Sequence, residues 1–114
     1  MPELKEIIDE IKTAAGEILR TAGEIGKDSL ENVEGFSKRQ LEGLANHSVI
    51  IGKGVLIGDL TKEEAKTEFE NLKEIAKNFA NTLIGLLAVT IEKIWNAIVK
   101  ILGGVVKSIA GLIL

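Results

Sequence analysis

Charged side chains are distributed very unevenly along this 114-residue chain, and that distribution limits what its C-terminal third can do. The sequence has 17 acidic and 14 basic residues, yet residues 83–114 contain only four of them. Three of these four are Lys93, Lys100 and Lys107, whose spacing of seven places them in one narrow row along a helix. A helix that is apolar on nearly all its other sides must be covered by protein or by lipid. The sequence therefore predicts a long, strongly apolar C-terminal helix over 83–113.

The first part of the chain has the apolar periodicity of an amphipathic helix. Within residues 3–26 the apolar side chains recur at alternating spacings of four and three, which forms a continuous stripe on one side of a helix. The stripe consists of Leu4, Ile8, Ile11, Ala15, Ile18, Ala22 and Ile25. Gly26 is a suitable C-terminal stop because glycine readily adopts the left-handed conformation. We therefore expect a helix over about 3–26.

A helical hairpin is predicted next, with one helix over about 29–57 and another from residue 61 onward. Asp28 is a candidate N-cap for the first of these helices. The second begins with Thr61 and Glu64, which have the Thr-x-x-Glu spacing of a capping box and follow a glycine that ends the preceding helix. The hairpin corner is the clearest local signal in the sequence.

The segment 49–57 is more ambiguous because it is rich in β-branched residues. It also fits two short strands around Gly52 and Gly54. Two strands of that length with no third strand would be only marginally stable in water. We therefore expect a helix in which both glycines are tolerated because a neighbouring helix approaches closely.

The course of the chain after the hairpin depends on whether the last helix breaks. Residues 61–102 in one helix would extend for about 63 Å, whereas 29–57 would extend for only about 43 Å. Gly85 and Gly103–Gly104 are candidate breaks, but no proline or clear cap accompanies them, and this slightly favours an unbroken helix that projects beyond its hairpin. In either case we expect an all-α, elongated antiparallel helical bundle of three to four helices, formed by 1–114 as a single domain.

Acidic residues form a second row with the same period as the lysines. Four glutamates of the first helix border its apolar stripe: Glu3, Glu10, Glu17 and Glu24. We predict that these glutamates and the row Lys93, Lys100 and Lys107 set the orientation of two packed helices, as flanking charges do in coiled coils. The two rows would face each other within the chain or between chains, while a solvated face with only local pairs is the alternative.

The function predicted from these features is that of a non-catalytic structural or assembly protein. It would form a homo-oligomer through its apolar C-terminal helix, with interface positions at Ile94, Trp95, Ile98, Ile101, Leu102, Val105 and Ile109. A peripheral membrane-binding or membrane-active protein, whose lysine-bearing helix lies on a lipid surface, is the first alternative. A small adaptor that binds one protein partner is the second. A transmembrane span fits poorly, because the longest stretch without charge is 78–91.

Several function classes lack the residues that they need. Cysteine is absent, and His47 is the sole histidine, so no metal site of the usual type is expected. The pair Gly52 and Gly54 lacks the remaining residues of a phosphate loop. A net charge of −3 and only four aromatic residues disfavour nucleic acid as a partner. We therefore expect no enzyme activity, cofactor or small-molecule substrate. The charged N-terminus lacks a secretory signal, which favours the cytoplasm, with membrane association as the alternative.

Overall fold

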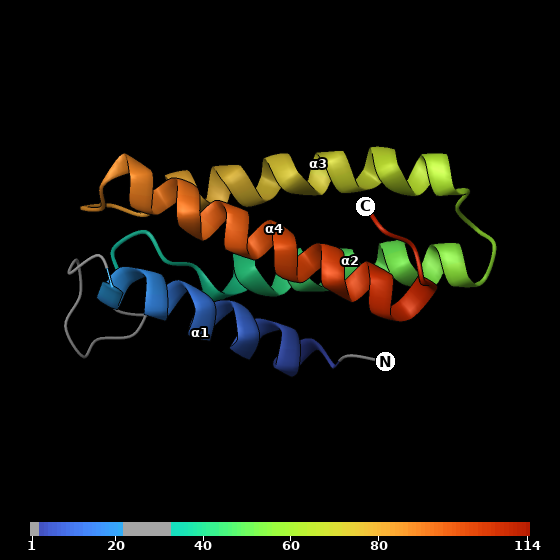
Figure 1. The fold of residues 1–114 in the computed structure, drawn as a ribbon, viewed down its shortest axis with the longest axis horizontal. Coiled ribbons are helices and arrows are strands. Elements are labelled where there is room, and N and C mark those ends of the chain that lie inside the picture. Colours follow the sequence, from blue (N-terminus) through green and yellow to red (C-terminus); the bar gives the residue numbers. More distant parts are fainter. Residues whose placement is uncertain (1–2, 22–32) are drawn as a thin grey trace.

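The computed structural model describes residues 3–21 and 33–114, and every regular element in these two ranges is a helix. The helices are α1 (Leu4–Thr21), α2 (Lys38–Leu56), α3 (Lys62–Asn81) and α4 (Ala88–Ala110). They run alternately up and down a bundle that measures 45 × 23 × 21 Å (Figure 1). The predicted all-α, elongated antiparallel bundle is confirmed, and it has four helices.

The four apolar stripes meet in one core, in which α4 packs against each of the other three helices. The largest fully buried side chains are Ile7, Ile11 and Leu19 of α1, Leu41, Leu44 and Ile51 of α2, Leu72 of α3, and Ile94, Ile98, Leu102 and Val106 of α4. Because α4 supplies core residues to every neighbour, the most apolar segment of the sequence is also the most central one.

The hairpin between α2 and α3 closes at the predicted capping box. The backbone N–H of Glu64 donates to Thr61 Oγ1 over 3.1 Å, and the Thr61 N–H donates to Glu64 Oε1 over 3.0 Å. Each bond satisfies a backbone donor that the first turn of a helix leaves without a partner. The predicted start of this helix is therefore confirmed.

Replacing Thr61 by alanine is expected to lower the free energy of unfolding by about 1 kcal/mol. Alanine lacks the hydroxyl that accepts the bond from the Glu64 N–H, and the reciprocal bond from the Thr61 N–H depends on the same cap geometry. Thr67→Ala is the matched control, since the Thr67 hydroxyl is exposed and bonds only to the Glu63 carbonyl within the same helix. Urea unfolding of the two variants measures the difference. Equal losses of unfolding free energy in Thr61→Ala and Thr67→Ala would contradict the capping role of Thr61.

The second helix begins later than predicted. Residues 33–37 are not helical, and α2 starts at Lys38 rather than near residue 29. The N-cap is Ser37, whose hydroxyl accepts a hydrogen bond from the Gln40 N–H over 3.2 Å. A serine at this position offers a helix start as good as the one expected from Asp28, so the apolar spacing alone could not select between them.

Several predicted features lie outside the residues that the structure describes. They are the stripe positions Ala22 and Ile25, the charged position Glu24, the helix stop at Gly26 and the cap at Asp28. Within the described residues, the helix predicted over 3–26 is present as far as Thr21.

Of the two courses that the sequence left open after the hairpin, the slightly favoured one, a single helix over 61–102 that projects beyond the hairpin, is wrong, and the helix breaks and the chain folds back. The chain leaves α3 and turns back over residues 82–87, where Gly85 has a φ of 84°. Thr82 ends α3, since its hydroxyl donates to the Phe79 carbonyl over 2.6 Å and its N–H donates to the same oxygen over 3.0 Å. A threonine at a helix C-terminus is a weak sequence signal for the end of a helix. The absence of a proline therefore favoured a continuous helix although the helix ends at Thr82.

The C-terminal helix is accordingly shorter than the predicted 83–113. It runs from Ala88 to Ala110 without interruption at Gly103–Gly104 and ends before Gly111, whose φ of 69° is left-handed. The Gly111 N–H donates to the Lys107 carbonyl over 2.8 Å and so closes the last turn.

The close approach expected around the glycines of α2 is present at Gly52. A Cβ added there would lie 3.0 Å from the Cβ of Ile109, so α4 packs directly against the α2 backbone. At Gly54 the neighbour is instead Leu60, in the turn after α2, whose Cδ1 would lie 2.8 Å from an added Cβ. The helix predicted over 49–57 is confirmed, and the two glycines have different reasons to be small.

Candidate self-association surface

Four of the seven predicted interface residues belong to the core of their own chain. Ile94, Ile98 and Leu102 are at most 1% exposed, and Val105 is 4% exposed. The heptad spacing identified a buried side of α4 correctly, but the helices that bury it are those of the same chain. This side of α4 is therefore not a free surface.

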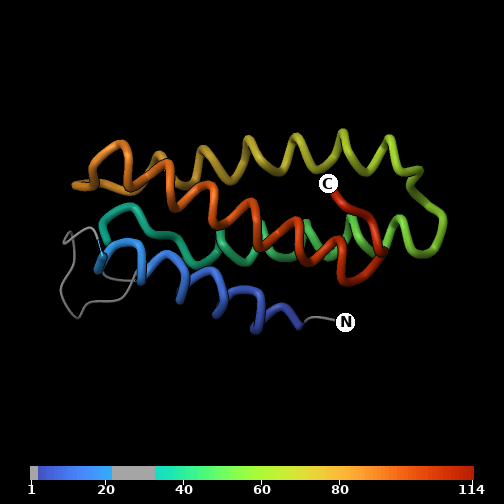
Figure 2. The backbone as a smooth tube through the Cα atoms, viewed as in Figure 1, coloured from blue at the N-terminus to red at the C-terminus, as the bar shows by residue number. Residues whose placement is uncertain are grey.

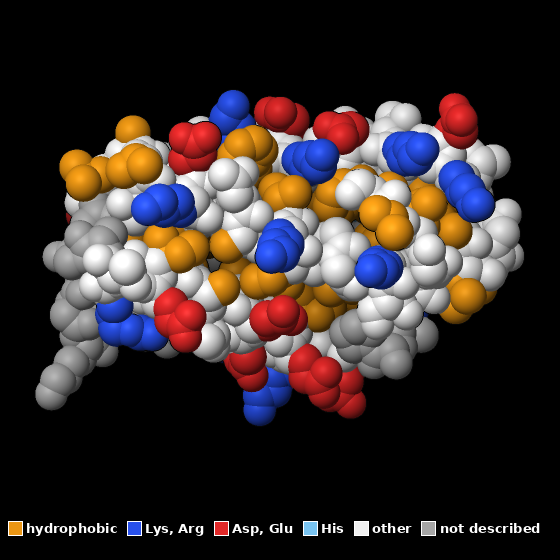
Figure 3. All heavy atoms as spheres, viewed as in Figure 1, with side chains coloured by type: hydrophobic (Ala, Val, Ile, Leu, Met, Phe, Trp, Pro, Cys, Tyr) orange, Lys and Arg blue, Asp and Glu red, His pale blue; other side chains and the backbone are white. Residues whose placement is uncertain are grey.

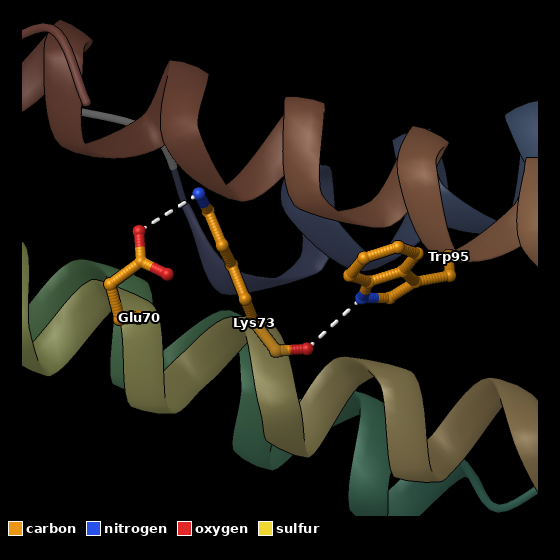
Figure 4. A network of polar contacts seen from close by, with 3 residues as sticks. All are labelled: Glu70, Lys73 and Trp95. Carbon is orange, nitrogen blue, oxygen red and sulfur yellow. Dashed lines mark hydrogen bonds and ion pairs between the residues drawn. The ribbon is translucent and has the colours of Figure 1, made fainter.

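Trp95, Ile101 and Ile109, the other three, are partly buried and pack around that core. Trp95 joins α4 to α3, because its indole Nε1–H donates to the Lys73 carbonyl over 3.0 Å (Figure 4). The ammonium of Lys77 lies 5.6 Å from the centre of the indole ring. Such a fixed and partly covered tryptophan is a packing residue of the bundle.

The outer side of α4 carries the predicted lysine row. Lys93, Lys100 and Lys107 are all exposed. Figure 3 shows basic side chains in a line along α4, and acidic side chains gathered over α1 below it. None of the three lysines lies within 4.0 Å of a carboxylate oxygen in the part of the chain that the structure describes.

A groove of about 840 Å³ runs between α1 and α4 beside this row. Glu6 and Glu10 line it from α1, and Lys100 lines it from α4. The small residues Ala97 and Gly104 also line the groove, and a Cβ added at Gly104 would have nothing within 4 Å. The groove therefore combines open space with charges of both signs.

The glutamate and lysine rows meet in the order that antiparallel helices require. Figure 2 shows α1 and α4 running in opposite directions along the bundle. Glu10 and Lys100 share the main groove, while Glu17 and Lys93, each seven residues away, share a smaller hollow at the same seam. Glu3 is exposed one heptad before Glu10. Among the described residues, the structure thus places Glu10 near Lys100 and Glu17 near Lys93 at one seam of the chain, without an ion pair between these members of the two rows.

Several residues of this surface were not predicted from the sequence. Ala97, Gly104 and Ser108 of α4 line the groove, as do Ala14 and the charged Glu6 of α1. The spacing of seven between Ala97 and Gly104 was a usable signal, since small residues in such a row leave space on one side of a helix. The lysines of the same helix have the same spacing and form the stronger pattern, so the small residues were not predicted as part of a surface.

The opposite side of the bundle, formed by α2 and α3, has smaller apolar hollows. His47 lines two of them, with Ile75 beside one and Ile50 beside the other. His47 Nε2 lies 3.5 Å from the Glu68 carboxylate, so the sole histidine makes a local pair across the two helices. These hollows lack the facing rows of opposite charge that distinguish the seam of α1 and α4.

Within residues 3–21 and 33–114, no group of three His, Asp or Glu side chains is placed to hold a metal ion. No helix among them is both long enough and apolar enough to cross a membrane. No protein-family model matches the chain, and comparisons with curated proteins and with solved structures find no significant match.

Proposed function

We propose that this chain is a non-catalytic structural subunit that self-associates through the outer side of α4 together with the adjoining side of α1. The observation that carries the proposal is the groove between these helices, where Glu10 and Lys100 flank open space without forming an ion pair. Opposite charges meet across protein interfaces, so Glu10 and Lys100 can each gain a group of opposite charge from a second molecule.

The proposal differs from the sequence prediction in the side of α4 that it uses. The apolar side, with Ile98 at its centre, is covered by the chain itself. The remaining side offers Ala97, Gly104 and the lysine row, so an interface formed there would be held by charge complementarity rather than by an apolar centre. Self-association would then be reversible and would depend on protein and salt concentrations.

Gly104→Gln is expected to abolish self-association while leaving the fold intact. An added side chain at Gly104 meets no atom within 4 Å of its Cβ, so it fills the groove without disturbing the monomer. Gly43→Gln is the matched control, because Gly43 is also exposed, helical and free of neighbours within 4 Å, but lies on α2. Both changes remove a helical glycine and should stabilise the monomer by up to about 1 kcal/mol.

Sedimentation velocity over a range of protein concentrations measures the outcome. The expected result is an oligomer for the wild type and for Gly43→Gln, and a monomer for Gly104→Gln. A wild-type chain that stays monomeric at every concentration would contradict the proposal. So would an oligomer that is equally stable in both variants.

A second candidate, peripheral membrane binding, is favoured by one observation. Ile84, Leu87 and Val89 are each more than half exposed where α3 turns into α4, at one end of the bundle. Apolar side chains at such an end could enter the boundary of a bilayer while the lysines contact anionic headgroups. Co-sedimentation with anionic vesicles tests this: binding that is lost in Leu87→Ser would support the membrane candidate, and absence of binding would remove it.

A further inference from the structure

We propose that two copies of this chain pair about a two-fold axis that is parallel to the long axis of the bundle, so that the lysine row of each copy lies over the glutamate row of the other. This inference rests on the proposed function and specifies its partner as a second copy. It also predicts the orientation and register of that copy.

Charged residues of the two rows lie at matching levels along the bundle. Lys100 and Glu10 line the same groove, and Lys93 and Glu17 line the same hollow. Each lysine is therefore close to the level of one glutamate along the bundle axis. Both sets of residues face the open side of the seam between α1 and α4.

Symmetry then decides which charges meet. A two-fold rotation about an axis along the groove exchanges the positions of α1 and α4 but keeps every residue at its own level. Lys100 of one copy would then lie over Glu10 of the second copy, and Lys93 over Glu17. A two-fold axis across the bundle would instead stack α4 on α4 and place like charges together, which costs several kcal/mol at an interface.

The surface is large enough for such a pair. The bundle is 45 Å long and 21–23 Å across, so one side can bury the ~800 Å² per partner of a standard interface. Close approach is possible because Ala97 and Gly104 of α4 have short or absent side chains and Gly104 has open space above it. The spacing of packed helices depends on the size of the side chains at their contact.

Two charge-reversed variants test the arrangement. The acidic variant, Lys93→Glu with Lys100→Glu, would present only negative rows, and the basic variant, Glu10→Lys with Glu17→Lys, would present only positive ones. All four residues are exposed, so the monomers should remain folded, which circular dichroism verifies. The matched control is Lys38→Glu with Lys53→Glu, which changes the net charge as the acidic variant does but on exposed positions of α2.

We expect each variant alone to self-associate at least about 100-fold more weakly than the wild type, because its rows repel those of its copy. An equimolar mixture of the two should form a one-to-one heterodimer, since negative rows then face positive rows. That heterodimer should weaken between about 0.1 and 1 M salt, as the screening length falls from about 10 to 3 Å. The control should self-associate like the wild type.

The alternative outcomes are distinguishable by sedimentation velocity of the separate and mixed proteins. If the wild type and both variants alone form equally stable oligomers, the rows are not in contact and the inference is overturned. Gly104→Gln then decides whether the groove between α1 and α4 is still the surface of self-association, as the proposed function requires. If each variant alone is monomeric and the equimolar mixture forms no heterodimer, the two-fold arrangement is also overturned. If the wild type itself is monomeric, the proposed function fails and this inference fails with it.

Discussion

Gly35→Ala is expected to lower the free energy of unfolding by about 3 kcal/mol or more, among the largest effects of a single substitution in this chain. Gly35 has a φ of 92°, a left-handed conformation that a residue with a Cβ adopts only at a cost of about 1–2 kcal/mol. An added Cβ would also clash with the carbonyl oxygen of Thr82, which is backbone and cannot rotate away. The substitution therefore forces two loops apart.

Those two loops hold the ends of three helices together. The turn before α2 contacts the turn between α3 and α4, because the Ile84 N–H donates to the Glu34 carbonyl over 2.7 Å. The Thr82 hydroxyl, which donates its proton to the Phe79 carbonyl over 2.6 Å, also lies 3.3 Å from the Gly35 carbonyl. Separating the loops would break the bond between Ile84 and Glu34, move Thr82 away from Gly35 and loosen the point where α4 turns back onto the bundle.

Gly85→Ala is the matched control for this prediction. Gly85 has a φ of 84°, nearly that of Gly35, but an added Cβ would meet nothing within 4 Å. Its loss should be limited to the conformational cost of about 1–2 kcal/mol. Urea unfolding followed by circular dichroism and by the fluorescence of Trp95 measures both variants. If the two alanine variants lose the same stability, the contact between the loops contributes nothing.

Local signals in the sequence predicted the parts of the fold that local chemistry determines. The capping box at Thr61 and the apolar stripe of α1 require only the residues within a few turns, and both are present in the structure. The break at Gly85 was not chosen over a continuous helix because its causes are distant in sequence. The turn that contains it is held by Glu34 and Gly35, almost fifty residues away. A single sequence does not show which glycine has such a partner.

The candidate surface was predictable in its charges but not in its position. The spacing of seven identified the row of Lys93 and Lys100 and the row of Glu10 and Glu17, and an antiparallel arrangement followed from the hairpins. Whether α1 lies beside α4 depends on how four helices close into a bundle, which the periodicity of each helix does not contain. For the same reason, periodicity showed that Ile98 is covered without showing by what.

Ile98→Ala tests what covers the apolar side of α4 and is expected to lower the free energy of unfolding by about 2–5 kcal/mol. Ile98 is 1% exposed in the core of its own chain, so truncation leaves a cavity inside the monomer. Val89→Ala is the control on the same helix, because Val89 is 56% exposed and its truncation should change stability by less than about 0.5 kcal/mol.

The dependence on protein concentration separates a core residue from an interface residue. If Ile98 packs within the monomer, the loss of stability measured by urea unfolding should be the same at high and low protein concentrations. A residue buried by a second copy would behave differently, since its truncation would weaken association and the apparent loss would change with concentration. Ile98→Ala could instead cause only a small loss of unfolding free energy at low protein concentration and dissociate the oligomer. That result would show that the apolar side of α4 is the interface, and it would contradict the assignment of Ile98 to the core of the monomer.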